Sequence, residues 1–155
     1  MHVIAAKAVC FREAVQPSFV EYQQSVLDNA VVLAADLEKA GLRLVSGGTD
    51  NHMLLVDLTK TGVTGLDAQL ALEAAGIVTN RNAIPFDTRP PRIASGMRFG
   101  TPAVTSRGMG KEEMKMIAGW IAGIISNIGD QDLQERIRRE VLQLCSRFPV
   151  PGIDY

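Results

Sequence analysis

The feature that most constrains this fold is an apolar stripe that begins after a proline and ends before a glycine. Its positions recur at spacings of three and four residues: Phe19, Tyr22, Val26, Ala30, Leu33 and Leu37. Such spacing places these side chains on one face of an α-helix. Pro17 suits the first turn of that helix, and Gly41 is a good stop signal. The sequence therefore predicts a long helix over residues 17–40 with one apolar face.

Shorter signals surround this helix. Further helices are predicted at residues 3–15, 64–75, 114–129 and 133–144. Short strands are predicted at residues 42–46, 53–58, 77–80 and 95–100. The strand at 53–58 is nearly all apolar, which predicts burial on both of its faces. The helices collect at both ends around a small sheet, so we expect an α+β fold and not a doubly wound parallel sheet.

Composition limits the class of protein. With 155 residues, 46% of them apolar, the chain is large enough for one domain with a packed core. A net charge of -1 argues against a nucleic-acid partner, which needs a clustered basic face. The two cysteines and two histidines lack metal-ligand spacing, so no metal site is predicted. Without a secretory signal or a bilayer-length apolar stretch, the sequence predicts a soluble, cytoplasmic protein with no membrane partner.

Arg98 is the first candidate for chemistry, because glycines stand two residues before it and two residues after it. Gly96 and Gly100 let a ligand or another backbone segment approach closely. The arginine fork is the preferred group for holding a carboxylate through two hydrogen bonds. A strand arginine that forms a salt bridge or faces solvent is the commoner alternative, and spacing alone favours it.

The segment 80–91 is the second candidate. Its Asn82 offers both a donor and an acceptor, which suits recognition of the edge of a heterocycle. Prolines stiffen the segment and deny it regular hydrogen bonding. The alternative is a structural turn in which Asn82 caps its own backbone, and the residue pattern alone favours that turn.

Other noticeable residues are assigned structural roles. Residues 47–49 join two predicted strands and lack the Lys-Ser/Thr ending of a phosphate loop, so a hairpin turn is predicted. His52, at a strand entrance, is interpreted as a structural hydrogen-bonding group. Trp120 is interpreted as a core or interface residue, and the basic run at 136–139 as the solvated face of the last helix.

Four segments of the chain resemble one enzyme family. They are residues 2–9, 45–52, 80–87 and 95–103, and they occur in the family's order. On these segments the chain resembles the C-terminal part of serine hydroxymethyltransferase, a pyridoxal-phosphate enzyme of the aspartate-aminotransferase fold type, fold type I. The resemblance covers essentially the whole chain. It implies the small C-terminal α+β domain of that fold, with helices packed on a small sheet and a long N-terminal helix.

The resemblance also implies a reaction and residue roles. The family moves the hydroxymethyl carbon of serine to tetrahydrofolate, which yields glycine and methylenetetrahydrofolate for one-carbon metabolism. Arg98 matches the arginine that grips the carboxylate of the amino-acid substrate, and Asn82 matches the asparagine that contacts the pteridine. Pro90, Pro91 and Arg92 match the loop that lines the folate site, where the family commonly has phenylalanine in place of Arg92.

Part of the family's machinery is not matched in this chain. The lysine that binds pyridoxal phosphate covalently belongs to a threonine-rich motif ending in His-Lys, and none of the lysines here has that context. No catalytic residue is therefore assigned, and the chain alone is expected to be inactive. Residues 1–40 would link to the large cofactor-binding domain, and residues 41–155 would form the small domain of a homodimer or higher oligomer. The alternative is a free-standing, non-catalytic module that binds a small molecule or dimerises.

Overall fold

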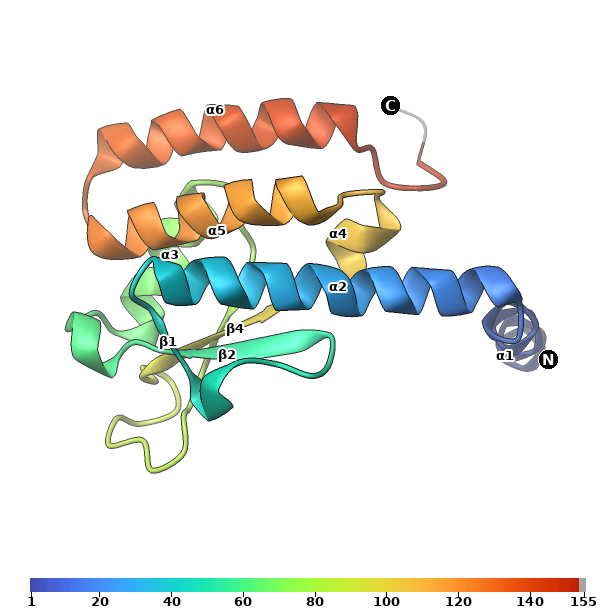
Figure 1. Ribbon diagram of the computed structural model, residues 1–155, viewed down its shortest axis with the longest axis horizontal. Coiled ribbons are helices and arrows are strands. Elements are labelled where there is room, and N and C mark those ends of the chain that lie inside the picture. The colour runs from blue at the N-terminus through green and yellow to red at the C-terminus, as the bar shows by residue number, and fades with distance from the viewer. Residues whose placement is uncertain (154–155) are drawn as a thin grey trace.

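Helix α2 (Pro17–Lys39) runs along one face of a small sheet (Figure 1). The structure is a computed structural model that describes residues 1–153. Pro17 occupies the first turn of α2, and Gly41 follows its end with a φ of +89°, as the sequence predicts. The apolar stripe is buried only from Val26 onward, because the first turns of the helix extend past the sheet.

The sheet has four strands, all antiparallel. They are β1 (Arg43–Leu44), β2 (Met53–Asp57), β3 (Asn80–Asn82) and β4 (Gly96–Gly100), in the spatial order β1-β2-β4-β3. The strand predicted at 42–46 is shorter than expected, because a 3-10 turn, η1 (Val45–Gly47), begins directly after β1.

The strand predicted at 77–80 is wrong in position. Pairing between β3 and β4 begins only at Asn80, which is opposite Arg98. One residue earlier, the side-chain hydroxyl of Thr79 donates to the carbonyl oxygen of Arg98 at 2.9 Å. Residues 77–79 run beside β4 without joining the sheet.

The helices cover only one face of the sheet. Leu54 and Val56 of β2 and Met97 of β4 are buried beneath the helices in the main apolar core. Leu55 points to the other face and is only half-buried, and Met53 is 38% exposed. The prediction that residues 53–58 are buried on both faces is therefore wrong, since no helix packs on the second side within the described residues. We call this second side the open face.

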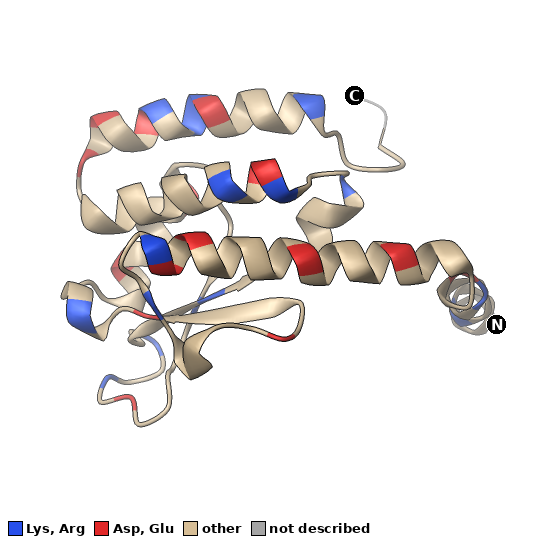
Figure 2. Ribbon diagram, viewed as in Figure 1, with Lys and Arg blue, Asp and Glu red and all other residues tan. Residues whose placement is uncertain are grey.

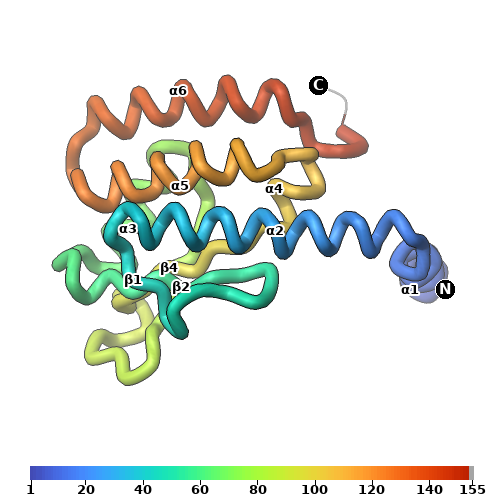
Figure 3. The backbone as a smooth tube through the Cα atoms, viewed as in Figure 1, coloured from blue at the N-terminus to red at the C-terminus, as the bar shows by residue number. Residues whose placement is uncertain are grey.

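The remaining helices lie on the same side of the sheet as α2 (Figure 3). They are α3 (Gly65–Ala74), α4 (Pro102–Ser106), α5 (Lys111–Ser126) and α6 (Gln131–Arg147), with α3 packed against β3 and β4. Helix α5 packs beside α2, and α6 lies over α3 and α5 as an outer layer. A second 3-10 turn, η2 (Thr59–Thr61), follows β2. The short helix α4 was not predicted, and the other helices confirm the predicted α+β class.

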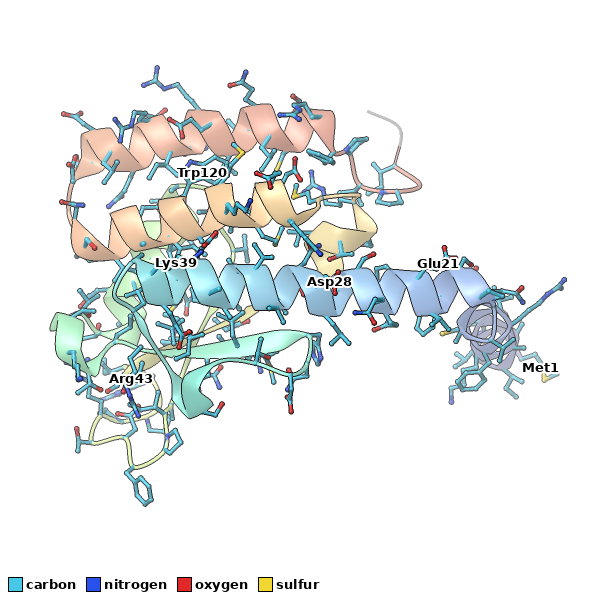
Figure 4. All side chains as sticks on the ribbon, viewed as in Figure 1. Met1, Glu21, Asp28, Lys39, Arg43 and Trp120 are labelled. Carbon is cyan, nitrogen blue, oxygen red and sulfur yellow. The ribbon has the colours of Figure 1, made fainter. Side chains whose placement is uncertain are left out.

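Helix α1 (His2–Ala14) stands apart from this body and contains no buried residue. It lies at the far end of α2, next to the labelled Met1 in Figure 4. The second half of α2 contributes Leu33 and Leu37 to the same core as the sheet. The division into segments 1–40 and 41–155 stays a prediction, and the last two residues of the second segment lie outside the described residues.

Charged residues recur along α6, as Figure 2 shows. The basic residues of the run at 136–139 are all exposed, which confirms their interpretation as a solvated face. Trp120 is 8% exposed, and its indole Nε1 donates to Glu140 on α6 at 2.7 Å. Within residues 1–153, no helix combines the length and apolar character needed to cross a membrane.

Candidate functional site

Arg98 and Asn82 come together on the open face of the sheet. Arg98 lies opposite Leu55 of β2 and Asn80 of β3, and Asn82 lies opposite Gly96. Because alternate residues of a strand share a face, Arg98 and the two asparagines point to the same side. The sequence proposed Arg98 and Asn82 separately, and the sheet register makes them neighbours on one surface.

The side chains of both residues are available to a ligand. Arg98 is exposed, and its guanidinium forms no hydrogen bond or ion pair with any residue in the described part of the chain. Of the two alternatives for Arg98, the salt bridge is absent from residues 1–153, and the side chain faces solvent. The Asn82 amide likewise makes no hydrogen bond to residues 1–153, so the turn in which it caps its own backbone is absent there.

A cavity of about 490 Å³, which we call the turn cavity, joins these two residues to the β1–β2 connection. Its walls are residues 45–51, residues 53–55, Asn82 and Arg98. The connection is a turn between antiparallel strands, which confirms the hairpin prediction for residues 47–49. Gly48, with a φ of +138°, adopts a backbone conformation that side chains disfavour. The turn forms the wall of the cavity on the β1–β2 side.

Asp87 organises the irregular segment between β3 and β4. Its Oδ1 accepts from the hydroxyl of Ser95 at 2.6 Å and from the backbone N–H of Arg89 at 2.9 Å. Its Oδ2 accepts from the backbone N–H groups of Ser95 at 2.9 Å and of Ile84 at 3.3 Å. The Ser95 hydroxyl and these N–H groups lower the pKa of Asp87 to about 2, against an ordinary value of 3.8. An ionised Asp87 therefore closes the segment onto the start of β4.

Pro90, Pro91 and Arg92 lie on this segment but do not line the turn cavity. All three are exposed, and the carbonyl oxygen of Pro90 accepts from the backbone N–H groups of Ile93 and Ala94, each at 2.9 Å. The structure therefore brings Arg98 and Asn82 together and leaves these three residues apart from them. The folate role of the three residues stays a prediction.

Gly96 is a positioning residue that sequence reasoning missed. A Cβ atom added there would lie 2.6 Å from Ile84 Cγ2 and 2.9 Å from the carbonyl oxygen of Asn82. Only a glycine lets the Asn82 backbone approach β4 this closely. In the sequence this glycine predicted the close approach of a ligand or of another backbone segment, and the structure shows the backbone of Asn82 there. Asp87 was also missed, although an aspartate in a proline-rich turn commonly accepts backbone N–H groups.

The sequence predicts that His52 forms a structural hydrogen bond, but its imidazole is exposed and forms none within residues 1–153. The backbone carbonyl of His52 instead accepts from the backbone N–H of Thr101 at 3.1 Å. This bond continues the β2–β4 pairing by one step beyond the Met53–Gly100 pair.

A second cavity, which we call the core cavity, also reaches Arg98 and measures about 660 Å³. It extends from His52 and Arg98 into the apolar space between β4, α5 and α6. None of the lysines of the chain lines either cavity: Lys39, Lys111 and Lys115 form ion pairs with Asp36, Asp28 and Glu112. The described residues also form no group of three or more His, Cys, Asp or Glu side chains suited to a metal ion.

Comparison with known proteins gives a consistent result along the chain. The profile of a family described as serine hydroxymethyltransferase matches residues 1–121. A curated serine hydroxymethyltransferase of Dehalococcoides mccartyi strain BAV1 is 56% identical over 155 residues, and the proteins of strains CBDB1 and 195 are each 55% identical. Each match covers 99% of this chain and 37% of the relative, so the chain spans little more than a third of the length of these relatives.

Proposed function

The chain belongs to the serine hydroxymethyltransferase family, and from this premise we propose that its open face forms the substrate side of such an enzyme's active site. The observation that carries the proposal is the guanidinium of Arg98, which lines the turn cavity without an internal partner. The parent reaction would interconvert serine and tetrahydrofolate with glycine and methylenetetrahydrofolate.

Arg98 would hold the carboxylate of serine or glycine. A guanidinium binds a carboxylate through two parallel charge-assisted hydrogen bonds, which fixes both position and orientation. The neighbours across the ladder, Leu55 and Asn80, carry no charge that would compete for it. Orienting the amino acid in this way sets the direction of the bond to be broken, which lowers the entropic part of the barrier.

Asn82 would contact the pteridine of tetrahydrofolate. Its amide offers a donor and an acceptor on the same cavity wall as Arg98, and neither is used within the described chain. Pro90, Pro91 and Arg92 would line the outer part of the folate site. Arg92 brings an exposed positive charge to this region, which suits the anionic end of a folate.

Pyridoxal phosphate is the cofactor we propose for the parent enzyme, and this chain does not fit its covalent attachment. When bound, the cofactor supplies an electron sink for the bond that breaks. Neither cavity at Arg98 contains a lysine. We therefore propose that the attachment lysine belongs to a part of the enzyme outside these residues, that the chain alone is inactive, and that the parent acts as a cytoplasmic homodimer or higher oligomer.

A chimeric enzyme tests the proposal. The corresponding residues of the Dehalococcoides mccartyi BAV1 protein are replaced by this chain, and serine cleavage is measured with tetrahydrofolate. We expect an active chimera in which Arg98→Ala raises the KM for serine by roughly 100-fold, equivalent to ~3 kcal/mol for a lost charge-assisted pair. Arg98→Lys keeps the positive charge but loses the two parallel hydrogen bonds of the guanidinium. Its KM for serine should therefore lie between that of the unmodified chimera and that of Arg98→Ala. The exposed Arg138→Ala is the matched control. An unchanged KM for serine in Arg98→Ala would refute the carboxylate role.

A further inference from the structure

We propose that the core cavity is a second ligand site, one that binds a small apolar carboxylate with its charged end at Arg98. Its chemistry differs from that of the turn cavity, because its lining is mostly apolar.

The core cavity lies beside the point where the β3–β4 ladder stops. The pair Asn80–Arg98 is its last step, and Thr79 closes it with a side-chain bond to the Arg98 carbonyl. Residues 76–79 then run past the end of β4 outside the sheet. The gap of about 660 Å³ connects the open face, at Arg98 and His52, with the interior beneath α5 and α6.

The interior part of the cavity suits an apolar group. Leu33, Met114, Trp120, Ile121 and Leu144 all line it, and each is less than one-tenth exposed. Cavities of roughly 300–1,000 Å³ with apolar walls and a few polar groups are typical of small-molecule sites. An aliphatic or aromatic tail would therefore exchange water for apolar contacts here.

The charge at the rim selects an anion. Two arginines line the cavity, and the guanidinium of Arg107 is already engaged, donating from Nε to Phe148 O at 2.7 Å and from an NH2 group to Cys145 O at 3.2 Å. Arg98 has no such partner in the described part of the chain. Among residues 1–153, no aspartate or glutamate lines this cavity. A carboxylate would therefore meet an uncompensated positive charge, whereas an ammonium group would be repelled.

The single tryptophan of the chain supplies the readout. Trp120 lines the core cavity and lies between α5 and α6 (Figure 4). The probe is octanoate, titrated into the 155-residue chain while Trp120 emission is recorded, with calorimetry for stoichiometry. We expect saturable binding of one octanoate per chain, and binding of octan-1-ol at least about tenfold weaker, the ratio expected for a lost charge-assisted bond.

Two variants separate the charge from the cavity. Arg98→Gln should remove the preference for octanoate over octan-1-ol, and the exposed Arg138→Gln should leave it unchanged. Ile117→Phe, which narrows the cavity from a half-buried position, should weaken both probes. Thermal unfolding checks that each variant is folded.

The proposal is overturned if octanoate shows no saturable binding up to about 10 mM, a very weak affinity on any scale. It is also overturned if Arg98→Gln keeps the full preference for octanoate, or if folded Ile117→Phe binds both probes as the unmodified chain does. Both proposals use Arg98, but Ile117 and Trp120 line only the core cavity. A failure of octanoate to bind would therefore leave the proposed enzymatic role standing, and a normal KM for serine in Arg98→Ala would refute that role without deciding the apolar site.

Discussion

Leu55 and Arg98 stand directly opposite each other in the β2–β4 ladder, with both side chains on the open face. Opposite residues in an antiparallel pair are near neighbours, with Cβ atoms roughly 5 Å apart. Leu55 can therefore support the aliphatic stem of Arg98 while leaving the guanidinium without a counter-charge. The availability of Arg98 depends on the identity of a residue more than 40 positions earlier in the chain.

Leu55→Glu should weaken the binding of the substrate carboxylate by Arg98 while the arginine itself stays in place. A carboxylate opposite the guanidinium would form a cross-strand ion pair worth ~0.2–1 kcal/mol and compete with the substrate carboxylate. In the chimeric enzyme we expect the KM for serine to rise by up to about fivefold, the factor that corresponds to ~1 kcal/mol, with little change in the urea midpoint of the chain. Leu55→Gln is the uncharged control. Equal KM values for the two variants would show that charge at this position does not matter.

Gly96→Ala should disturb Asn82 more than Arg98. The added Cβ would lie 2.6 Å from Ile84 Cγ2 and 2.9 Å from the Asn82 carbonyl oxygen, so either β3 or the following segment must move. We expect a loss of about 1–3 kcal/mol in the free energy of unfolding, as for other overpacked sites, and a larger KM change for tetrahydrofolate than for serine. Gly100→Ala is the matched control, because its Cβ would meet nothing closer than 3.5 Å. Similar urea midpoints for the two variants would contradict the prediction.

Asp87 should make the stability of the chain sensitive to acid. Its folded-state pKa of about 2 is below the ordinary value of 3.8, so the unfolded chain takes up a proton first as the pH falls. The stabilisation is complete above about pH 4 and is lost as the pH falls toward 2. Asp87→Asn should be less stable than the unmodified chain at neutral pH and should show a shallower loss of unfolding free energy between these pH values.

The measurement is urea unfolding at several pH values from 2 to 5. Asp50→Asn, in the exposed β1–β2 turn, removes the same formal charge and serves as control. An Asp87→Asn variant whose pH profile runs parallel to that of the unmodified chain would argue against a stabilising role for this carboxylate.

Asn29 should be a strong determinant of stability. It is 2% exposed on α2, and its Nδ2 donates to Thr105 Oγ1 at 2.9 Å and to the Met109 carbonyl at 3.0 Å. Asn29→Ala removes both bonds and leaves a buried carbonyl unsatisfied, which should cost about 1–3 kcal/mol in the free energy of unfolding. Asn127→Ala removes one exposed amide bond, to Gly123 O, and should change the urea midpoint little. Comparable losses in the two variants would contradict the burial argument.

Much of the fold was accessible from sequence patterns alone. The bounds of α2 followed from Pro17 and Gly41, and Thr64 caps α3 by accepting from the backbone N–H of Asp67 at 3.0 Å. These signals act within a few residues, so they can be interpreted without knowing the rest of the chain. The shift of the third strand to Asn80 could not be predicted, because it depends on pairing with Arg98, which lies 18 positions later.

Sequence patterns were enough to predict the five longer helices, the α+β class, the family and the two polar residues Arg98 and Asn82. Only the folded chain shows that these two residues share one face and one cavity, that no helix within residues 1–153 covers the second side of β2, and that the ladder stops at Asn80. These two sets of features differ in how far apart in the sequence the interacting residues lie. Caps, turns and helical periodicity arise from neighbours in the chain, whereas strand register and burial arise from contacts between segments that only folding brings together.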